Sequence, residues 1–359
     1  MLKGKKIELF CGTGGVGKTT LATARALSLS RQGNKVLLIT IDPAKRLKQI
    51  LNIKDENAGE VSTISHSQID ENDTSNGHLY ALLMSPTRTL KRIAETDMEE
   101  TNEKGETTGF ENPVLKILSR PNGGMNEIMA IIEVQHQLKR GNYDVIVLDT
   151  PPGKHFIDFL EASNKIKNFF DKSFVDIFRY FGKTFEKGEA ISRAPRKLFK
   201  KILNTGVKKL LSYLEHVTGP HFVEIFVDAI VTLYRNREAF LEALNFQESL
   251  KSEKVSNWFL VTSVDQDKLQ EAGSFRGQAI SFMHEDSYLT VNKSLSTHLE
   301  QWNPTDTGLS RLKSSMLNKE QRIDEFASKN FDKVLYFPEV LSNSPAGHVT
   351  ELSYSWEKS

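Results

Sequence analysis

The stretch "FCGTGGVGKTT" constrains the fold more than any other part of the chain. It follows the short apolar run "IELFC", and the pattern after it predicts a helix that begins at Lys18. The phosphate-loop pattern G-x-x-x-x-G-K-[ST] begins at Gly12 and ends at Thr19, in the strand-to-helix context that this pattern requires. The sequence therefore predicts an α/β fold with a phosphate-binding loop at the end of a strand.

The chemistry of such a loop follows from its residue types. Glycines let successive backbone N–H groups turn toward phosphate oxygens, and the helix N-terminus adds its positive dipole. Lys18 reaches the β- and γ-phosphates, and the hydroxyl of Thr19 ligates Mg²⁺. We therefore expect ATP or ADP and Mg²⁺ as ligands. The residues predicted to contact the nucleotide here are Gly12, Thr13, Gly14, Gly15, Val16, Gly17, Lys18, Thr19 and Thr20.

Six further apolar runs predict strands that alternate with helical patterns in much of the chain. They are Lys35–Thr40, Leu79–Met84, Tyr143–Asp149, Asn257–Ser263, Ser287–Asn292 and Lys333–Pro338. This alternation is typical of a parallel sheet covered by helices, so we predict an α/β P-loop NTPase with a mainly parallel, helix-flanked sheet. Two polar segments, 55–78 and 95–112, are expected to be solvated loops.

The strand pattern stops between about residues 155 and 249. Phenylalanines recur there at helical spacing, and the stretch 163–210 carries thirteen Lys or Arg against four acidic residues. We predict a nucleotide-binding core from 1–154 and 250–359, with an inserted amphipathic helical subdomain at 155–249 and helices near 86–140 packing beside it. These helices could pack as ordinary core, seat an apolar client helix or lie on an anionic membrane.

Two aspartates follow predicted strands. Asp42 in "TIDPAKRL" comes after the second strand, and Asp149 in "VLDTPPGKH" ends the fourth. Ligands of open α/β sheets lie at the carboxyl ends of the strands. We therefore expect Asp42 to orient an attacking water and Asp149 to reach Mg²⁺. The candidate metal site thus comprises Thr19, Asp42 and Asp149. The alternative for each aspartate is a helix-capping role.

Together these stretches resemble the motifs of the arsenite-pump and guided-entry (tail-anchored protein targeting) ATPases, which belong to the dimeric deviant-Walker class. "LTVNKSL" is similar to the strand where the family uses an asparagine for adenine, here Asn292, and "LYFPEV" resembles its C-terminal adenine loop at Pro338, Glu339 and Val340. His155 matches the family's second-switch histidine. The resemblance implies ATP hydrolysis by a homodimer or heterodimer whose two sites close face to face, with a client-binding insert.

Three departures from the family pattern change what it implies. Thr13 replaces the signature lysine that reaches the partner's nucleotide. Cys11 is the single cysteine, so thiolate capture of arsenite and a zinc CxxC site are not expected. Lys45 and Arg46 stand where many relatives carry other residues, and we hypothesise that one of them supplies catalytic charge. The alternative is that both are solvated charges at a helix start.

Composition narrows the remaining function classes. The net charge is +1, so nucleic acid is not an expected partner. The lone cysteine suits a reducing compartment, and neither a signal peptide nor an apolar run long enough to span a bilayer is evident. We expect a cytoplasmic protein that could act peripherally at a membrane. The rival interpretations are a nucleotide-dependent scaffold or partition-type assembly ATPase and, disfavoured by the tandem switch motifs, a small-molecule kinase.

Overall fold

The computed structural model describes residues 2–42, 45–89, 91–92, 125–153, 155–161 and 248–358, together with the single residues 216, 242 and 246. The chain divides into two compact units. One comprises Met1–Met84, His136–Leu160 and Gln247–Ser359, and the other comprises Ser85–Gln135 and Glu161–Phe246. The predicted loop at 95–112 and nearly all of the predicted insert at 155–249 lie outside the described residues, and both stay predictions.

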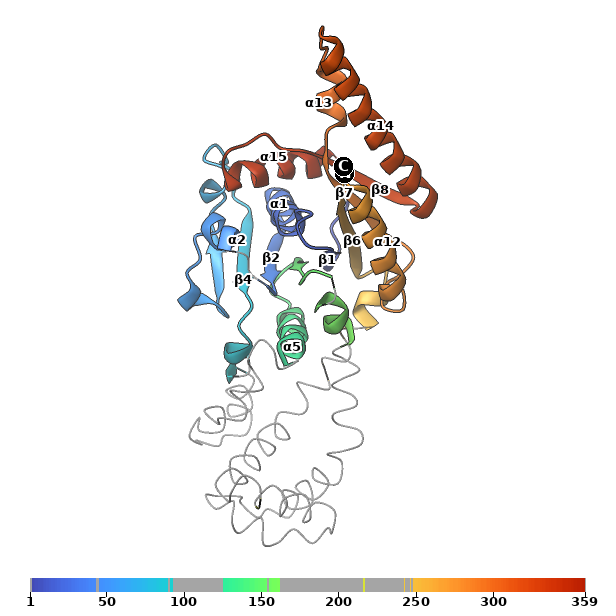
Figure 1. Ribbon diagram of the computed structural model, residues 1–359. Coiled ribbons are helices and arrows are strands. Elements are labelled where there is room, and N and C mark those ends of the chain that lie inside the picture. The colour runs from blue at the N-terminus through green and yellow to red at the C-terminus, as the bar shows by residue number, and fades with distance from the viewer. Residues whose placement is uncertain are drawn as a thin grey trace, which may run out of the picture. The chain divides into compact units, whose positions relative to one another are not determined.

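The first unit is built on an eight-stranded sheet (Figure 1). The strands are β1 (Ile7–Gly12), β2 (Lys35–Thr40), β3 (Val61–Ile64), β4 (His78–Leu83), β5 (Val145–Asp149), β6 (Ser256–Ser263), β7 (Tyr288–Ser294) and β8 (Lys333–Pro338). Their order across the sheet is β3-β4-β2-β5-β1-β6-β7-β8. Every neighbouring pair is parallel except β3 and β4. The predicted α/β class with a mainly parallel sheet is confirmed.

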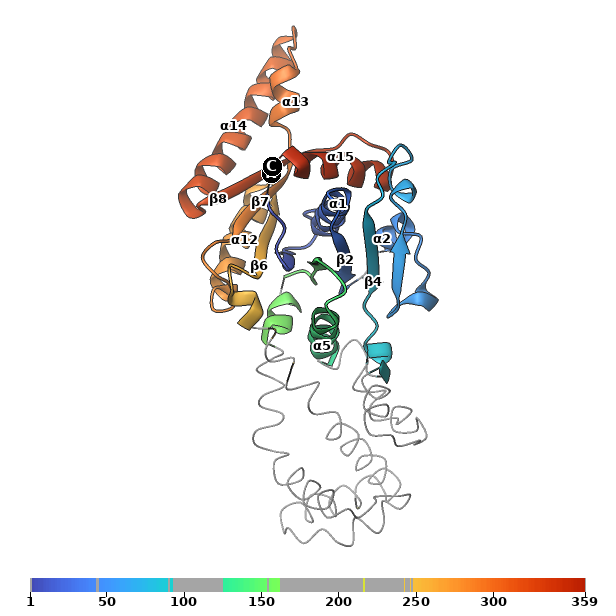
Figure 2. The same cartoon turned by 180° about the vertical axis from the view of Figure 1, so that it is seen from behind.

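The helices with described bounds are α1 (Lys18–Arg31), α2 (Lys45–Ile50), α5 (Met125–Arg140), α12 (Gln266–Ala279), α13 (Ser296–Gln301), α14 (Thr307–Asn330) and α15 (Pro345–Lys358). Helices α1 and α15 lie side by side in both views, and α1 packs against β1, β2, β4 and β5 (Figures 1 and 2). Helices α12 and α14 begin where Asp265 and Asp306 accept hydrogen bonds from the first-turn N–H groups. No helix in the described part of the chain is long and apolar enough to cross a membrane.

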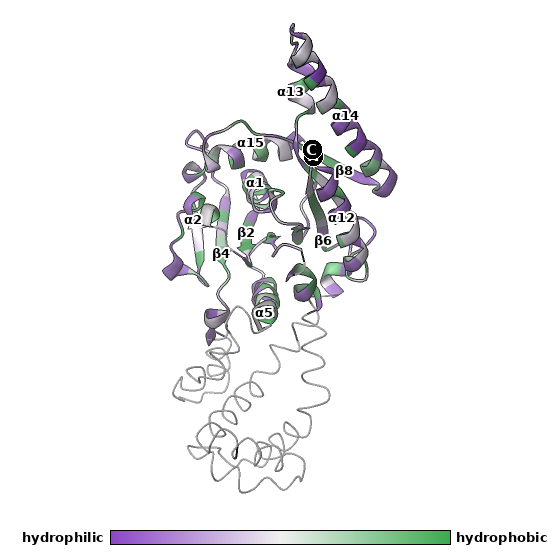
Figure 3. Cartoon of the chain, in the orientation of Figure 1, coloured by the Kyte–Doolittle hydropathy of each residue, from purple (hydrophilic) through white to green (hydrophobic). Residues whose placement is uncertain are grey.

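One hydrophobic cluster lies between the sheet and the α1–α15 pair, and Phe156, Trp258 and Phe275 belong to a further buried group. The central strands are buried along nearly their whole length and are mainly apolar, as expected for strands covered on both faces, whereas α14 is mostly hydrophilic (Figure 3). Phe10 stacks on Phe259 with ring centroids 4.7 Å apart, and Trp356 packs edge-on against both rings. The indole N–H of Trp356 donates to the Leu21 carbonyl oxygen at 3.2 Å. The C-terminal helix is thereby fixed to the helix that follows the phosphate loop.

A fully buried ion pair also joins the core elements. The guanidinium of Arg25 on α1 donates to both carboxylate oxygens of Glu8 on β1, at 2.7 and 3.0 Å. Asn257 on β6 donates to the same carboxylate at 3.2 Å, and the Arg25 guanidinium lies over the Trp356 ring. These hydrogen bonds satisfy charges that would otherwise be costly to bury.

The predicted solvated loop over 55–78 is mostly exposed, as expected, but it contains regular structure that the prediction did not include. This segment holds two short 3-10 turns, Asp55–Asn57 and His66–Gln68, and the antiparallel edge strand β3. Two of its acidic residues are bound to α1, because Arg31 binds Asp70 at 2.8 Å and Asp73 at 2.5 Å. Elements of three or four residues leave no periodic pattern, and only part of the polar composition belongs to this ion-pair network.

Candidate nucleotide-binding site

The phosphate loop connects β1 to α1, and two glycines show why it tolerates few side chains. Gly12 has a φ of 146°, and a Cβ there would lie 2.3 Å from the carbonyl oxygen of Val261. Gly17 has a φ of 87° at the N-cap of α1, and a Cβ there would lie 2.2 Å from Nδ2 of Asn292. Gly17 places no capping side chain over the first N–H groups of α1. They are left for an anionic ligand.

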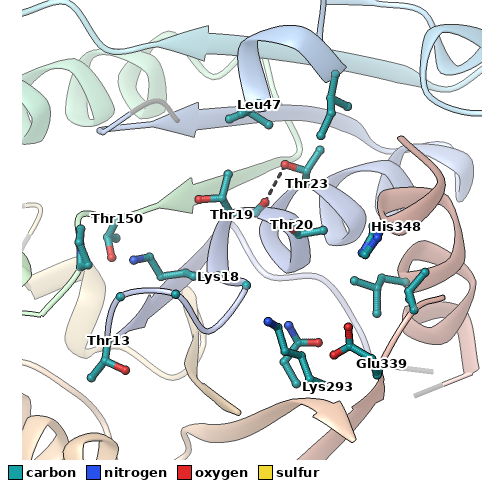
Figure 4. Close-up of a pocket in the computed structure, with 18 of the residues that line it drawn as sticks. Thr13, Lys18, Thr19, Thr20, Thr23, Leu47, Thr150, Lys293, Glu339 and His348 are labelled. Atoms are coloured by element: carbon teal, nitrogen blue, oxygen red, sulfur yellow. Dashed lines mark hydrogen bonds between the residues drawn. The ribbon is translucent and has the colours of Figure 1, made fainter. Parts of the chain in front are cut away.

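The loop borders a cavity of about 450 Å³ (Figure 4). Most of the residues predicted to bind the nucleotide line it: Thr13, Gly14, Gly15, Gly17, Lys18, Thr19, Thr20, Asp42, Asn292, Pro338 and Glu339. Gly12, Val16 and Asp149 do not line it. Gly12 lies against β6, the Val16 side chain is buried in the core, and Asp149 is buried and reached from the cavity through Thr19. Fold topology thus gathers residues from α1, β7 and β8 and from the segments that follow β1 and β2 around one cavity.

Lys18 lies at one end of this cavity, which we call the phosphate end. Its side chain is largely buried, and this burial lowers its pKa, while the nearby carboxylates of Asp149 and Asp42 act in the opposite direction. Cys11 lies behind the loop, where burial raises its pKa to about 12 and its thiol donates to the Phe259 carbonyl oxygen at 3.6 Å. The thiol is therefore a core group, whereas the Lys18 ammonium faces the cavity (Figure 4).

Thr19 and Asp149 form the pair that fits a divalent cation. The Thr19 hydroxyl donates to Oδ2 of Asp149 at 2.8 Å, and Oδ1 of Asp149 is buried with no partner among the described residues. Burial raises the pKa of Asp149 to about 6, although Lys18 and the Thr19 hydrogen bond both favour the carboxylate. A hydroxyl beside a carboxylate with an unused buried oxygen suits Mg²⁺, which prefers oxygen ligands.

The segment after β5 is tied to the phosphate loop. The Thr150 hydroxyl donates to the Phe10 carbonyl oxygen at 2.7 Å, and the Gly153 N–H donates to the Gly12 carbonyl oxygen at 3.1 Å. Thr13 lies beside these contacts, and its buried hydroxyl has no partner in the described part of the chain. A displacement of the segment after β5 would therefore act directly on the start of the loop.

The other end of the cavity, which we call the base end, is formed by β7, β8 and α15. Asn292 donates through Nδ2 to the Val16 carbonyl oxygen at 2.9 Å, so its side chain ties β7 to the backbone of the phosphate loop. The Glu339 backbone is fixed twice, because its N–H donates to the Ser294 carbonyl oxygen and its carbonyl oxygen lies 2.8 Å from Nε2 of His298. Figure 4 shows Glu339 and His348 across the cavity from Lys18 and Thr150.

Comparison with known proteins agrees with this geometry. A family model of anion-transporting ATPases matches residues 5–298. The chain belongs to this ATPase family. It is 29% identical over 184 residues to a protein of Aquifex aeolicus named as an arsenical pump-driving ATPase, and 26% identical over 247 residues to the ATPase GET3 of Malassezia globosa. These alignments span 47% and 66% of this chain, and they span 41% and 68% of the two relatives' own lengths.

Two predicted catalytic residues of this anion-transporting ATPase family member are only partly described. Lys45 and Arg46 begin α2, but their side chains lie outside the described residues, so their predicted role stays a prediction. Asp42 lies two residues after the end of β2. It is exposed and lines the rim of the cavity. His155 is exposed at the start of the helical residues 155–161.

Sequence reasoning missed several residues that line the cavity. They are Thr23, Leu47, Ile50, Thr150, Pro152, Lys293, His348 and Leu352. Lys293 directly follows Asn292, so its position next to a predicted binding residue was an available signal. His348 and Leu352 project from α15, far from the phosphate loop in sequence. Only their spacing of four residues, which places them on one helix face, could have linked them.

Proposed function

We propose that this protein binds ATP with Mg²⁺, hydrolyses it and works as a dimeric switch. The observation that carries the proposal is the hydrogen bond from Thr19, which lines the cavity beside Lys18, to the buried carboxylate of Asp149. It combines a hydroxyl, a carboxylate with an unused oxygen and an ammonium group, which are the groups that a bound Mg²⁺–triphosphate requires.

The chain's own residues divide the chemistry as follows. The loop N–H groups and Lys18 bind the β- and γ-phosphates and offset their negative charge. Thr19 and Asp149 hold Mg²⁺, with Asp42 at the rim of the site. When bound, the metal neutralises charge that develops on the transferred phosphoryl group. Asp42 orients the attacking water, because it is the exposed carboxylate at the carboxyl end of β2.

The direct test measures phosphate release from Mg-ATP by the purified full chain. We expect turnover in the wild type, and a loss of at least about a hundredfold for Asp42→Asn with retained ATP binding. For Lys18→Ala we expect loss of binding as well. Turnover of Asp42→Asn at the wild-type rate would refute the assignment of the water-orienting residue. A phosphorylated acceptor in place of free phosphate would instead support a kinase.

Dimerisation is part of the proposal and rests on family membership and on the motif resemblance. A shared active site predicts that turnover per molecule rises with protein concentration. Light scattering with ATP and with ADP then separates two outcomes. A dimer with ATP and also with ADP supports the switch, whereas polymers that form with only one of the two nucleotides support a scaffold or assembly ATPase. A concentration-independent rate from a monomer would refute the dimer.

Thr13 raises the question of which cation completes the site, and we propose Lys45 or Arg46. Both begin α2, directly after the segment that carries Asp42. Lys45→Ala and Arg46→Ala are therefore expected to lower turnover, at least one of them strongly. Lys48→Ala is the matched control, because Lys48 lies on the same helix and pairs with Asp55. Unchanged turnover in both test variants would rule out this role.

We further propose that the predicted insert binds a hydrophobic protein client or an anionic membrane surface, and that the protein is cytoplasmic. The support is the sequence of residues 155–249, with its phenylalanine stripes and basic residues. Binding of a hydrophobic dye should differ between the ATP and ADP states, and equal binding would count against a nucleotide-gated surface. Flotation with anionic and neutral vesicles separates a membrane partner from a protein client. Neither zinc nor nucleic acid is part of the proposal.

A further inference from the structure

Lys293 adopts a backbone conformation that its residue type disfavours. Its φ is 62°, and Asn52, with a φ of 49°, is the other residue besides glycine with a positive φ among those described. Asparagine tolerates this left-handed region, whereas lysine adopts it at a cost. The strain coincides with an irregularity in the β7–β8 ladder between Val291 and Ser294. Strained residues of this kind gather at functional sites when their surroundings enforce them.

The residues on either side of Lys293 enforce this conformation. Asn292 is buried and bound to the Val16 carbonyl oxygen. Ser294 is buried, its carbonyl oxygen accepts from the Glu339 N–H, and its hydroxyl donates to Glu320 at 2.9 Å. The chain between two anchored neighbours must turn outward. Lys293 is therefore exposed in an otherwise largely buried strand, and it lines the base end of the cavity.

The Lys293 ammonium has no structural task in the described part of the protein. No ion pair or hydrogen bond of its side chain occurs among the described residues, in contrast to Lys48 and Lys333, which pair with Asp55 and Asp286. Figure 4 shows Lys293 next to Glu339 at the base end, away from Lys18. The strained backbone at Lys293 thus places an ammonium group without a partner among the described residues, on a long apolar side chain, at the base end of the cavity.

We propose that Lys293 is a nucleotide-binding residue that lays its side chain, both stem and ammonium group, over the face of the purine base. Lysine stems cover apolar surfaces while the charged group stays solvated, and an ammonium group is attracted to an aromatic face. This inference rests on the proposed binding of ATP at this cavity. It assigns to Lys293 affinity for the nucleoside part, separate from the phosphate affinity of Lys18.

The test uses the full chain and the variants Lys293→Gly, Lys293→Met and Asn52→Gly. Lys293→Gly removes both the strain and the side chain, so the melting temperature without nucleotide should rise while ATP and ADP bind about five to ten times more weakly. Binding of inorganic tripolyphosphate should stay unchanged. Lys293→Met keeps the stem and loses the charge, so its affinity should lie between those of the wild type and Lys293→Gly.

Asn52→Gly is the matched control, because Asn52 also has a positive φ but does not line the cavity. It should leave nucleotide affinity unchanged. Equal ATP affinity in the wild type and Lys293→Gly would overturn the inference while leaving the proposed function intact. An equal loss for ATP and tripolyphosphate would overturn it too, because the role would then be at the phosphates. Failure of the wild type to bind ATP would instead refute the proposed function itself.

Discussion

The hydroxyl of Thr19 donates a 2.8 Å hydrogen bond to Oδ2 of Asp149, and this contact joins the first turn of α1 to the end of β5. The second oxygen of the same carboxylate is buried without a partner among the described residues. Folding leaves this carboxylate poorly solvated, and burial raises its pKa to about 6. A group that destabilises the protein without its ligand is expected where a ligand supplies the missing interactions.

Asp149→Asn should therefore stabilise the nucleotide-free protein at pH 8. The folded-state pKa is raised above the unfolded value of 3.8, so the stabilising effect of the proton is lost as the pH rises through about 6. Asparagine keeps the shape without the charge, and at about 1.4 kcal/mol per pKa unit the expected gain in the free energy of unfolding is about 2–3 kcal/mol. Urea denaturation measures it, with Asp332→Asn, an exposed aspartate, as the control. No gain would show that Asp149 is better solvated than its burial suggests.

The same carboxylate predicts the pH dependence of Mg-ATP binding. Asp149 must be deprotonated to hold a metal, so binding should weaken as the pH falls through about 6. Titration calorimetry between pH 5 and 8 measures the trend, and the same titration in EDTA is the control. Without the metal the dependence should be much smaller. An identical pH profile with and without Mg²⁺ would contradict a metal role for Asp149.

Asn292 should act on the whole phosphate loop, because it holds the Val16 carbonyl oxygen at 2.9 Å. Asn292→Ala leaves that buried oxygen without its partner and frees the loop, at a cost of about 1–3 kcal/mol in the free energy of unfolding. ATP and tripolyphosphate should both bind about tenfold more weakly, unlike the selective loss expected for Lys293→Gly. Parallel calorimetric titrations with the two ligands compare these effects. A loss for ATP alone would instead place Asn292 at the base.

The sequence predicts most of this sheet because its inner strands are buried and therefore mainly apolar. The edge strand β3 escaped prediction because it has four residues with a mostly exposed pattern, and its register is set by pairing with β4. The phosphate loop was predictable because its chemistry is local. The base end of the cavity was only partly predictable, because His348 and Leu352 reach it from α15. Trp356 fixes α15 against α1, and this contact joins parts of the chain that are distant in sequence.

The buried pair of Glu8 and Arg25 should show strong coupling. Arg25→Met leaves the carboxylate of Glu8 buried with only neutral donors such as Asn257, so we expect a loss of about 3–5 kcal/mol in the free energy of unfolding. In the double variant Glu8→Leu, Arg25→Met no charge is left unpaired, and its loss should be smaller than that of Arg25→Met alone. Chemical denaturation of the two single variants and the double variant completes the cycle. Additive losses would show that the two charges are independent.

His66 should make the protein sensitive to mild acid. Its ring lies between the hydroxyls of Ser30 at 2.8 Å and Ser75 at 2.5 Å, and burial lowers its pKa, with Arg31 acting in the same direction and Asp73 opposing it. Below the unfolded value of 6.5 the unfolded chain binds a proton that folded His66 does not, so stability falls as the pH drops.

His66→Asn should reduce this loss between pH 7.5 and 5, while it lowers stability at pH 7.5 through the altered hydrogen bonds. Urea denaturation at several pH values gives both quantities for the variant and the wild type. His284, whose pKa burial also lowers, remains in the variant and acts in the same direction, whereas the raised pKa of Asp149 opposes both histidines in this window, so the quantity compared is the difference between the slopes of variant and wild type. The lowered pKa of Asp73 acts only in stronger acid, below its ordinary value of 3.8, and does not contribute in this window. An unchanged slope in His66→Asn would show that folded His66 takes up a proton as easily as it does in the unfolded chain.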